Sequence, residues 1–149
     1  MAENLLENKK ARMKYALVEE YEAGIELFGY EVKSLRVKRG SLDGARVTVR
    51  GGEVYLLNAH IPAYQPKNAP ENYDSKRQRR LLLNKKEIAE LAEVESQKGL
   101  TIVPLSVYNS GRNIKVRVAT VRGKKKYDHR EDIKKRDTDR DIRRTLKNQ

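Results

Sequence analysis

The chain has 149 residues and no cysteine, and its 33 Lys and Arg outnumber 21 Asp and Glu to give a formal net charge of +12. This length suits one domain with one core, and the lack of cysteine excludes a disulfide framework and thiolate metal ligands. The charge makes a polyanion the first candidate partner. There is no long apolar run and no signal-peptide pattern, so we expect a cytoplasmic protein without a membrane segment.

The first third of the chain favours short strands. Residues 3–13 are polar, and we expect the start of this segment to be mobile. A period of two begins at Tyr15 and is interrupted near Gly24, which predicts two short strands. Residues 29–40 fit either a short helix or a strand, and we favour the helix.

The middle of the chain contains the clearest hairpin. Residues 46–50 and 53–57 alternate in polarity and are joined by Gly51-Gly52, which supply the positive φ that a tight turn requires. Residues 62–76 hold three of the four prolines and predict a loop that is long for a compact domain. Long loops in small domains are often functional.

One long helix and two further strands follow the loop. Asn84 and Glu87 resemble a capping box, and the apolar spacing after them predicts a helix over residues 85–98. Residues 100–105 and 114–121 read as strands. The chain is therefore predicted to be mainly β with a few helices, as a small closed or partly closed antiparallel β-barrel of the OB type.

The C-terminal segment differs from the rest of the sequence. From Asp128 onward, the only aliphatic side chains larger than alanine are those of Ile133, Ile142 and Leu146. So little apolar surface does not offset the entropy of ordering the backbone. The segment is nevertheless composed of good helix formers. We predict a barrel over residues 1–122 and a basic tail over residues 123–149 that is ordered only with a partner.

Catalysis has little support in the sequence. The two histidines, His60 and His129, have no metal-ligand spacing, and no serine has a recognisable base partner. We expect no enzyme, no cofactor and no metal site.

Nucleic-acid binding has more support. Basic side chains cluster at Lys33 and Arg36 and again at Arg77, Arg79 and Arg80, where guanidinium groups suit phosphate recognition. Tyr64 and Tyr73 could stand nearby as stacking platforms for bases. Glu22 fits two interpretations equally: an acceptor for the amino groups of a base edge, or a turn residue before Gly24.

At these residues the sequence closely resembles the SmpB family, the SsrA-binding or tmRNA-binding proteins of bacterial ribosome rescue. The resemblance runs through nearly the whole chain. Its most specific strings are Glu31-Val32-Lys33-Ser34-Leu35-Arg36 and Gly123-Lys124-Lys125, with further matches at Tyr21-Glu22-Ala23-Gly24-Ile25 and Arg79-Arg80-Leu81-Leu82-Leu83.

The resemblance implies an OB-like barrel that binds the tRNA-like domain of tmRNA and travels with alanyl-tmRNA and elongation factor Tu to a stalled ribosome. It also implies a tail that is disordered when free and helical on the ribosome, in the small-subunit decoding centre and the empty mRNA path. By position, tmRNA contacts fall on Asn8, Glu22, Leu82 and Asn84, supported by Lys33, Arg36, Arg77, Arg79 and Arg80. Decoding-centre contacts fall on Gly123, Lys124, Lys125, Tyr127, Asp128 and Arg130.

A second interpretation rests on charge and fold alone. A generic OB-type protein that binds single-stranded nucleic acid, or a ribosomal protein, would have the same composition. Such a protein would bind with an affinity that follows salt and RNA length rather than RNA shape. We expect a monomer in either case, because no predicted element has a spare apolar face.

Overall fold

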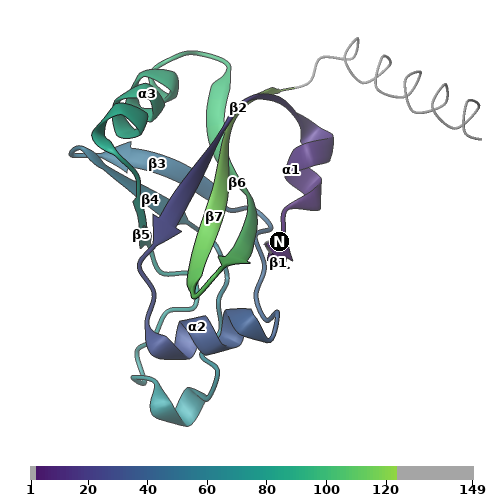
Figure 1. Cartoon of the computed structure of the whole chain (residues 1–149), viewed down its shortest axis with the longest axis vertical. Helices are drawn as coiled ribbons and strands as arrows, with labels where there is room; N and C mark the ends of the chain where they lie inside the picture. The colour runs from purple at the N-terminus through teal and green to yellow at the C-terminus, as the bar shows by residue number, and fades with distance from the viewer. Residues whose placement is uncertain (1–2, 124–149) are drawn as a thin grey trace, which may run out of the picture.

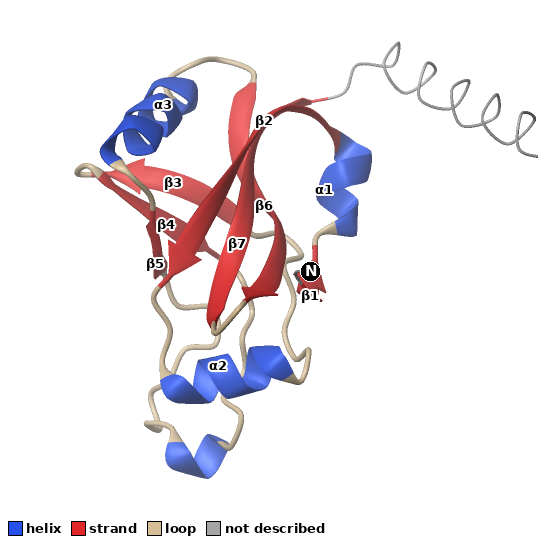
Figure 2. Cartoon of the chain, in the orientation of Figure 1, coloured by secondary structure: helices blue, strands red, loops and turns tan. Residues whose placement is uncertain are grey.

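The computed structural model describes residues 3–123 of the chain. These residues form one seven-stranded antiparallel sheet with the strand order β1-β6-β7-β2-β5-β4-β3. Three α-helices and one short 3-10 helix cover it (Figure 2). The strands are β1 (Glu3–Glu7), β2 (Tyr15–Ile25), β3 (Arg46–Arg50), β4 (Glu53–Leu57), β5 (Arg79–Leu82), β6 (Leu100–Ser110) and β7 (Asn113–Gly123). The α-helices are α1 (Lys9–Lys14), α2 (Gly29–Arg36) and α3 (Lys85–Glu95), and the 3-10 helix is η1 (Pro66–Asn68).

The sheet is strongly coiled without closing into a ring. Its two outermost strands, β1 and β3, are not hydrogen-bonded to each other, while β3 comes close to β6 across the interior (Figure 1). The prediction of a mainly β, OB-like architecture is confirmed, in the partly closed form. Among the described residues, no helix is long and apolar enough to cross a membrane.

The strand β2 is one continuous element, so the prediction of a break near Gly24 is wrong. It pairs with β7 along most of its length and with β5 at Gly24 and Ile25. Gly24 is needed for close approach and not for a turn, because a Cβ there would stand only 3.2 Å from the Cβ of Leu82. The polar N-terminal segment, for which no element had been named, contains β1 and α1.

The other predicted elements are present with shifted ends. The β3–β4 hairpin has the expected register, and its turn residues Gly51 and Gly52 have φ values of 56° and 76°. The helix predicted after Asn84 is α3, which ends at Glu95. The short helix predicted after Gly29 is α2. The two C-terminal strands, β6 and β7, are longer than expected and form a long antiparallel hairpin.

Two apolar clusters hold these elements together. The larger lies inside the coiled sheet and includes Leu35 of α2 and Leu91 of α3, both fully buried. The smaller packs Ala11 of α1 against β6 and β7. Burial of a leucine side chain contributes about 2 kcal/mol, so each helix is held mainly by its contact with the sheet. Helix α2 closes one end of the barrel and α3 the other (Figure 1).

Candidate nucleic-acid interface

Glu22 lies within β2, opposite Arg117 of β7, so the interpretation as a turn residue is wrong. Its Oε1 accepts a hydrogen bond from Lys115 Nζ at 2.7 Å, and its side chain remains 50% exposed. This hydrogen bond holds the pKa of Glu22 below its ordinary value. The carboxylate is therefore ionised at neutral pH and can accept hydrogen bonds from the amino groups of a base edge.

Leu82 lies beside this carboxylate on the neighbouring strand. Gly24 and Leu82 are paired in the sheet, two residues along β2 from Glu22. The Leu82 side chain is 47% exposed, which is unusual for a large apolar residue in a central strand. An acceptor and an apolar surface therefore stand next to each other, a combination that suits a base and its ribose.

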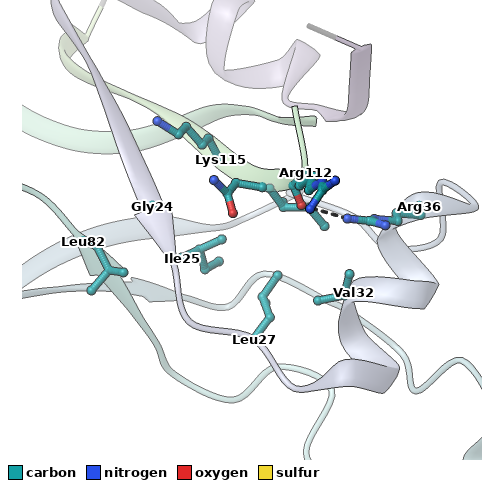
Figure 3. A pocket seen from close by; sticks show the side chains of 10 residues that line it. Gly24, Ile25, Leu27, Val32, Arg36, Leu82, Arg112 and Lys115 are labelled. Carbon is teal, nitrogen blue, oxygen red and sulfur yellow. Dashed lines mark hydrogen bonds between the residues drawn. The ribbon is translucent and has the colours of Figure 1, made fainter. Parts of the chain in front are cut away.

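A hollow of about 410 Å³ adjoins these residues, between the end of β2, α2 and the β6–β7 turn (Figure 3). Apolar side chains line it: Ile25 at the end of β2, Leu27 from the segment between β2 and α2, Val32 of α2, and Leu82 of β5. Cationic side chains also line it, from Arg36, Arg112 and Lys115. Such a hollow can take a base or ribose against its apolar wall and a phosphate at its cations.

Helix α2 fixes one side of this hollow. Arg36 Nη2 donates a hydrogen bond to the carbonyl oxygen of Arg112 at 3.0 Å, which links α2 to the β6–β7 turn. Lys33 and Arg36 are both exposed but line different hollows: Arg36 lines the one described above, and Lys33 lines another beside Tyr64. The two cations predicted to act together therefore face different parts of the surface.

Arg79 is a structural residue and not an exposed phosphate ligand. Its side chain is fully buried, and its Nε and Nη2 approach Glu31 Oε2 at 2.9 and 2.7 Å. Its remaining donors reach the carbonyl oxygens of Ala59 and Ser75 and the hydroxyl of Tyr73. Every polar atom of this guanidinium has a partner inside the protein, so the geometry leaves none for RNA.

Arg80 is separated from the other two arginines of the predicted cluster, Arg77 and Arg79, which both bond Glu31. Side chains alternate along a strand, so Arg79 and Arg80 point to opposite faces of β5. Arg80 is exposed and lies 3.6 Å from Glu26 and 3.3 Å from Glu53. Arg77 bonds both oxygens of Glu31. The predicted compact cluster of phosphate forks is not formed.

Glu31 is the centre of a buried network beneath α2. Its side chain is fully buried and accepts hydrogen bonds from Arg77, Arg79 and the Tyr73 hydroxyl, and from the backbone of Phe28. Burial alone would raise the pKa of Glu31, but the two guanidinium groups and the Phe28 amide hold it below its ordinary value. Burial also raises the pKa of Tyr73 to about 12, so its hydroxyl stays protonated and available as a donor.

Asn8 is also a structural residue in this geometry. It is 4% exposed, its Oδ1 caps α1 by accepting from the Ala11 amide at 3.2 Å, and its Nδ2 donates to the Pro104 carbonyl at 2.9 Å. Helix α1 packs on β6, whereas Leu82 lies on β5, three places away in the sheet order. The structure therefore does not bring Asn8 together with Glu22 and Leu82.

Replacing Asn8 with alanine is expected to lower the free energy of unfolding by about 1–3 kcal/mol, because it removes a helix cap and a buried hydrogen bond to the Pro104 carbonyl. Urea denaturation followed by circular dichroism measures this loss. The RNA affinity of the folded variant should stay within twofold of the parent. A stable variant with much weaker RNA binding would instead make Asn8 a direct ligand.

Asn84 and His60 also have local partners. Asn84 Oδ1 accepts from the Glu87 amide at 2.8 Å at the start of α3, and the residue is exposed. It can contact RNA only through atoms that this cap leaves free. His60 Nδ1 is 2.9 Å from Ser75 Oγ, and the residue forms an isolated bridge with Ser41. Among residues 3–123 there is no group of three or more His, Cys, Asp or Glu side chains that could hold a metal ion.

Only the first residue of the predicted ribosome-contacting segment is described. Gly123 is the last residue of β7 and pairs with Tyr15 at the start of β2. The other residues of that prediction lie outside the described residues, namely Lys124, Lys125, Tyr127, Asp128 and Arg130.

Comparison with known proteins identifies the family. Residues 5–148 match the model of the SmpB protein family. The SsrA-binding protein of Ligilactobacillus salivarius is 50% identical over 144 residues, which cover 97% of this chain and 92% of that protein. The chain belongs to the SmpB family. The SsrA-binding protein of Thermosipho melanesiensis is also 50% identical, over 141 residues, with coverage of 94% and 95%.

A solved SmpB structure agrees in fold. A structure described as "tmRNA-SmpB: a journey to the center of the bacterial ribosome" matches with a TM-score of 0.67 and 41% sequence identity, over 85% of this chain and 92% of that one. Membership of the SmpB family makes this an RNA-binding protein and confirms the prediction that it is not an enzyme.

The sequence analysis missed some residues of this SmpB surface. Lys115 and Arg112 were not singled out, although both line the hollow. The strand pairing could have pointed to Lys115, because the pairing of β2 with β7 places Lys115 opposite Gly24 and two residues from Arg117, the partner of Glu22. The sequence prediction ended the first strand near Gly24, so the pairing of Lys115 with Gly24 was not considered.

Proposed function

We propose that this chain binds the tRNA-like domain of tmRNA through one surface, which we call the tmRNA face. It consists of Glu22, Leu82, Asn84, Arg36, Arg112 and Lys115. The observation that carries the proposal is the ionised, half-exposed Glu22 carboxylate beside the exposed Leu82 at the edge of a hollow with cationic side chains. The SsrA-binding proteins to which the chain is similar are named for binding this RNA.

The rest of the proposed activity follows from the family. The barrel, residues 1–122, acts as one monomeric body that accompanies alanyl-tmRNA and elongation factor Tu to a stalled ribosome. The tail, residues 123–149, then enters the small-subunit decoding centre and the empty mRNA path. The match to a tmRNA–SmpB ribosome structure supports the ribosome as a partner. The protein contributes binding and placement, without a cofactor or a chemical step.

A titration against two RNAs tests this proposal. The tRNA-like domain of tmRNA and an unstructured RNA of equal length are compared at two salt concentrations. Recognition of shape predicts a preference for the structured RNA that survives the higher salt, whereas phosphate attraction alone falls steeply with salt for both RNAs. Equal binding that collapses with salt would support the generic single-strand binder and overturn the proposal.

Glu22→Ala is expected to weaken binding of the tRNA-like domain about 5- to 100-fold, since it removes acceptors worth about 1–3 kcal/mol for a base edge. The same change removes a negative charge, so binding of the unstructured RNA should not fall. Glu93→Ala, an exposed change on α3, is the matched control and should leave both affinities unchanged. A gain in affinity for both RNAs with Glu22→Ala would show that the carboxylate only repels phosphates.

A further inference from the structure

We propose that the surface around the start of α2 is a second RNA site, which takes an unpaired stretch of RNA by stacking its bases on aromatic rings. We call this surface the aromatic track; it is formed by Phe28, Tyr30, Tyr73 and Tyr64. It shares no residue with the tmRNA face and lies in different hollows. The proposal therefore stands or falls independently of how the tRNA-like domain is bound.

The first part of the track is a hollow of about 450 Å³ with mostly apolar walls. The rings of Phe28 and Tyr30 lie 5.5 Å apart between centroids, and Tyr30 and Tyr73 meet edge-on at 5.0 Å. The Arg77 guanidinium lies 4.2 Å from the centre of the Phe28 ring. Phe28 is 49% exposed, which leaves much of this apolar side chain accessible to a flat partner.

Two further hollows continue from the first, and each shares a side chain with the one before it. Tyr30 also lines a hollow of about 200 Å³ together with Lys33 and Tyr64. Tyr64 in turn lines a third hollow, of about 440 Å³, with Pro66 and Lys67. Residues of α2 and of the long loop that carries η1 contribute to the lining of these hollows. In Figure 1 this loop lies next to α2, at the end of the barrel opposite α3. An extended strand, with one base near each aromatic group, suits this arrangement better than a single small molecule.

The rings are held in place before any ligand binds. The Tyr64 amide donates to the Tyr30 carbonyl at 3.1 Å, which ties the loop to α2. The Tyr73 hydroxyl donates to Glu31 at 2.8 Å, and Arg77 bonds the same buried carboxylate. The network that excludes Arg79 from RNA therefore anchors the track, so little side-chain entropy would be lost on stacking.

The charges along the track favour RNA over a proline-rich peptide, which aromatic grooves also bind. Lys33, Lys67 and Arg39 are exposed, and among the described side chains none of them has a carboxylate within ion-pair distance. The Arg39 guanidinium lies 6.0 Å from the centre of the Tyr64 ring. Cations interleaved with rings match the alternation of phosphates and bases in a single strand. Asp74 and Asn72, at the first hollow, offer acceptors for base amino groups.

Hexauridylate titrated into the full-length protein tests the proposal by two readouts, binding affinity and the NMR shifts of the aromatic ring protons. Phe28→Leu and Tyr64→Leu keep apolar bulk but remove a ring, and each should weaken binding about 5- to 100-fold. Tyr64→Phe keeps the ring and should restore the affinity. Val18→Ala, an exposed apolar change on β2, is the matched control and should have no effect.

Three further measurements separate the possible outcomes. A sugar-phosphate hexamer without bases should leave the ring protons unmoved, because phosphate attraction alone does not stack. Glu22→Ala should leave hexauridylate binding intact. A variant that loses binding of the tRNA-like domain but keeps hexauridylate binding therefore reports on the tmRNA face and not on the aromatic track. Unchanged affinity of both leucine variants would overturn the proposal. A proline-rich decapeptide that shifts the ring protons when hexauridylate does not would also overturn it and identify a peptide groove.

Discussion

Glu31→Gln is expected to lower the free energy of unfolding by about 3–5 kcal/mol, because it leaves the buried Arg79 without a counter-charge. Glu31 and Arg79 are both fully buried, and Glu31 also bonds Arg77 and Tyr73. A glutamine has nearly the same shape, but its amide group would face guanidinium donors and can accept at only one of its two positions. Small domains have about 5–15 kcal/mol of stability, so this loss is a large fraction of the total.

The matched control is Glu26→Gln, which removes the same charge from an exposed ion pair with Arg80. Exposed pairs contribute about 0–1 kcal/mol, so the control should unfold at nearly the parental urea concentration. Arg79→Ala should lower the free energy of unfolding by a similar amount to Glu31→Gln. Any loss of RNA binding in this variant should follow from the smaller fraction of folded protein. A Glu31→Gln variant within 1 kcal/mol of the parent would contradict the assignment of this network as the main polar support of α2.

The stability difference between the parent and Glu31→Gln should depend on pH in one direction. The pKa of Glu31 in the folded protein lies below its ordinary value of 4.5, so the ion pairs contribute fully above that value. Their contribution is lost as the pH falls through the folded pKa. The difference should therefore be constant between pH 6 and 8 and shrink below about pH 4.5. A difference that grows on acidification would place the pKa above its ordinary value.

Local chemistry accounts for the elements that the sequence predicted correctly. The β3–β4 turn depends on Gly51 and Gly52, and the start of α3 depends on Asn84 and Glu87, so a few neighbouring residues suffice for each. The mainly β, OB-like class followed from the number of such strands. The order of the strands was beyond this reasoning, because β1 pairs with β6 and β2 pairs with β7 between residues about a hundred positions apart.

The errors have a common physical cause, which is tertiary contact. Gly24 resembles a turn residue until Leu82 of β5 is placed against it. Arg79 resembles a phosphate ligand until Glu31, 48 residues away, takes its donors. In both cases the local sequence is compatible with two roles, and only the partner decides between them. The alternation of side chains along β5 could have warned that Arg79 and Arg80 face opposite ways.

The sequence predicted only part of the candidate site correctly, again because tertiary contacts decide which side chains are accessible to RNA. Glu22 and Leu82 were among the tmRNA contacts implied by the resemblance to SmpB proteins, and the paired strands β2 and β5 place them close together. Asn8, predicted with them, instead caps α1 on another part of the sheet. The family pattern identifies residues that matter, and the structure separates those that support the fold from those that RNA can reach.

Truncation after Gly123 is expected to abolish peptide tagging of stalled ribosomes while leaving the affinity for the tRNA-like domain within about threefold. All seven strands of the described sheet are retained, because β7 ends at Gly123. The removed segment carries eleven Lys and Arg against six Asp and Glu, so its loss also weakens general attraction to RNA. The affinity should therefore be measured at a salt concentration that suppresses binding of unstructured RNA.

Point substitutions in the barrel and in the tail should affect different steps of the proposed function. In the full-length chain, Tyr127→Ala should reduce tagging with no change in tmRNA affinity, since it removes the aromatic ring from the predicted decoding-centre contacts while leaving the tail charge intact. Glu22→Ala should reduce tagging only as far as it reduces binding, and excess protein should restore it. Excess of the truncated protein should not restore tagging. If truncation lowered binding and tagging by the same factor, the tail would be part of the tmRNA site, and the separate role proposed for it on the ribosome would be wrong.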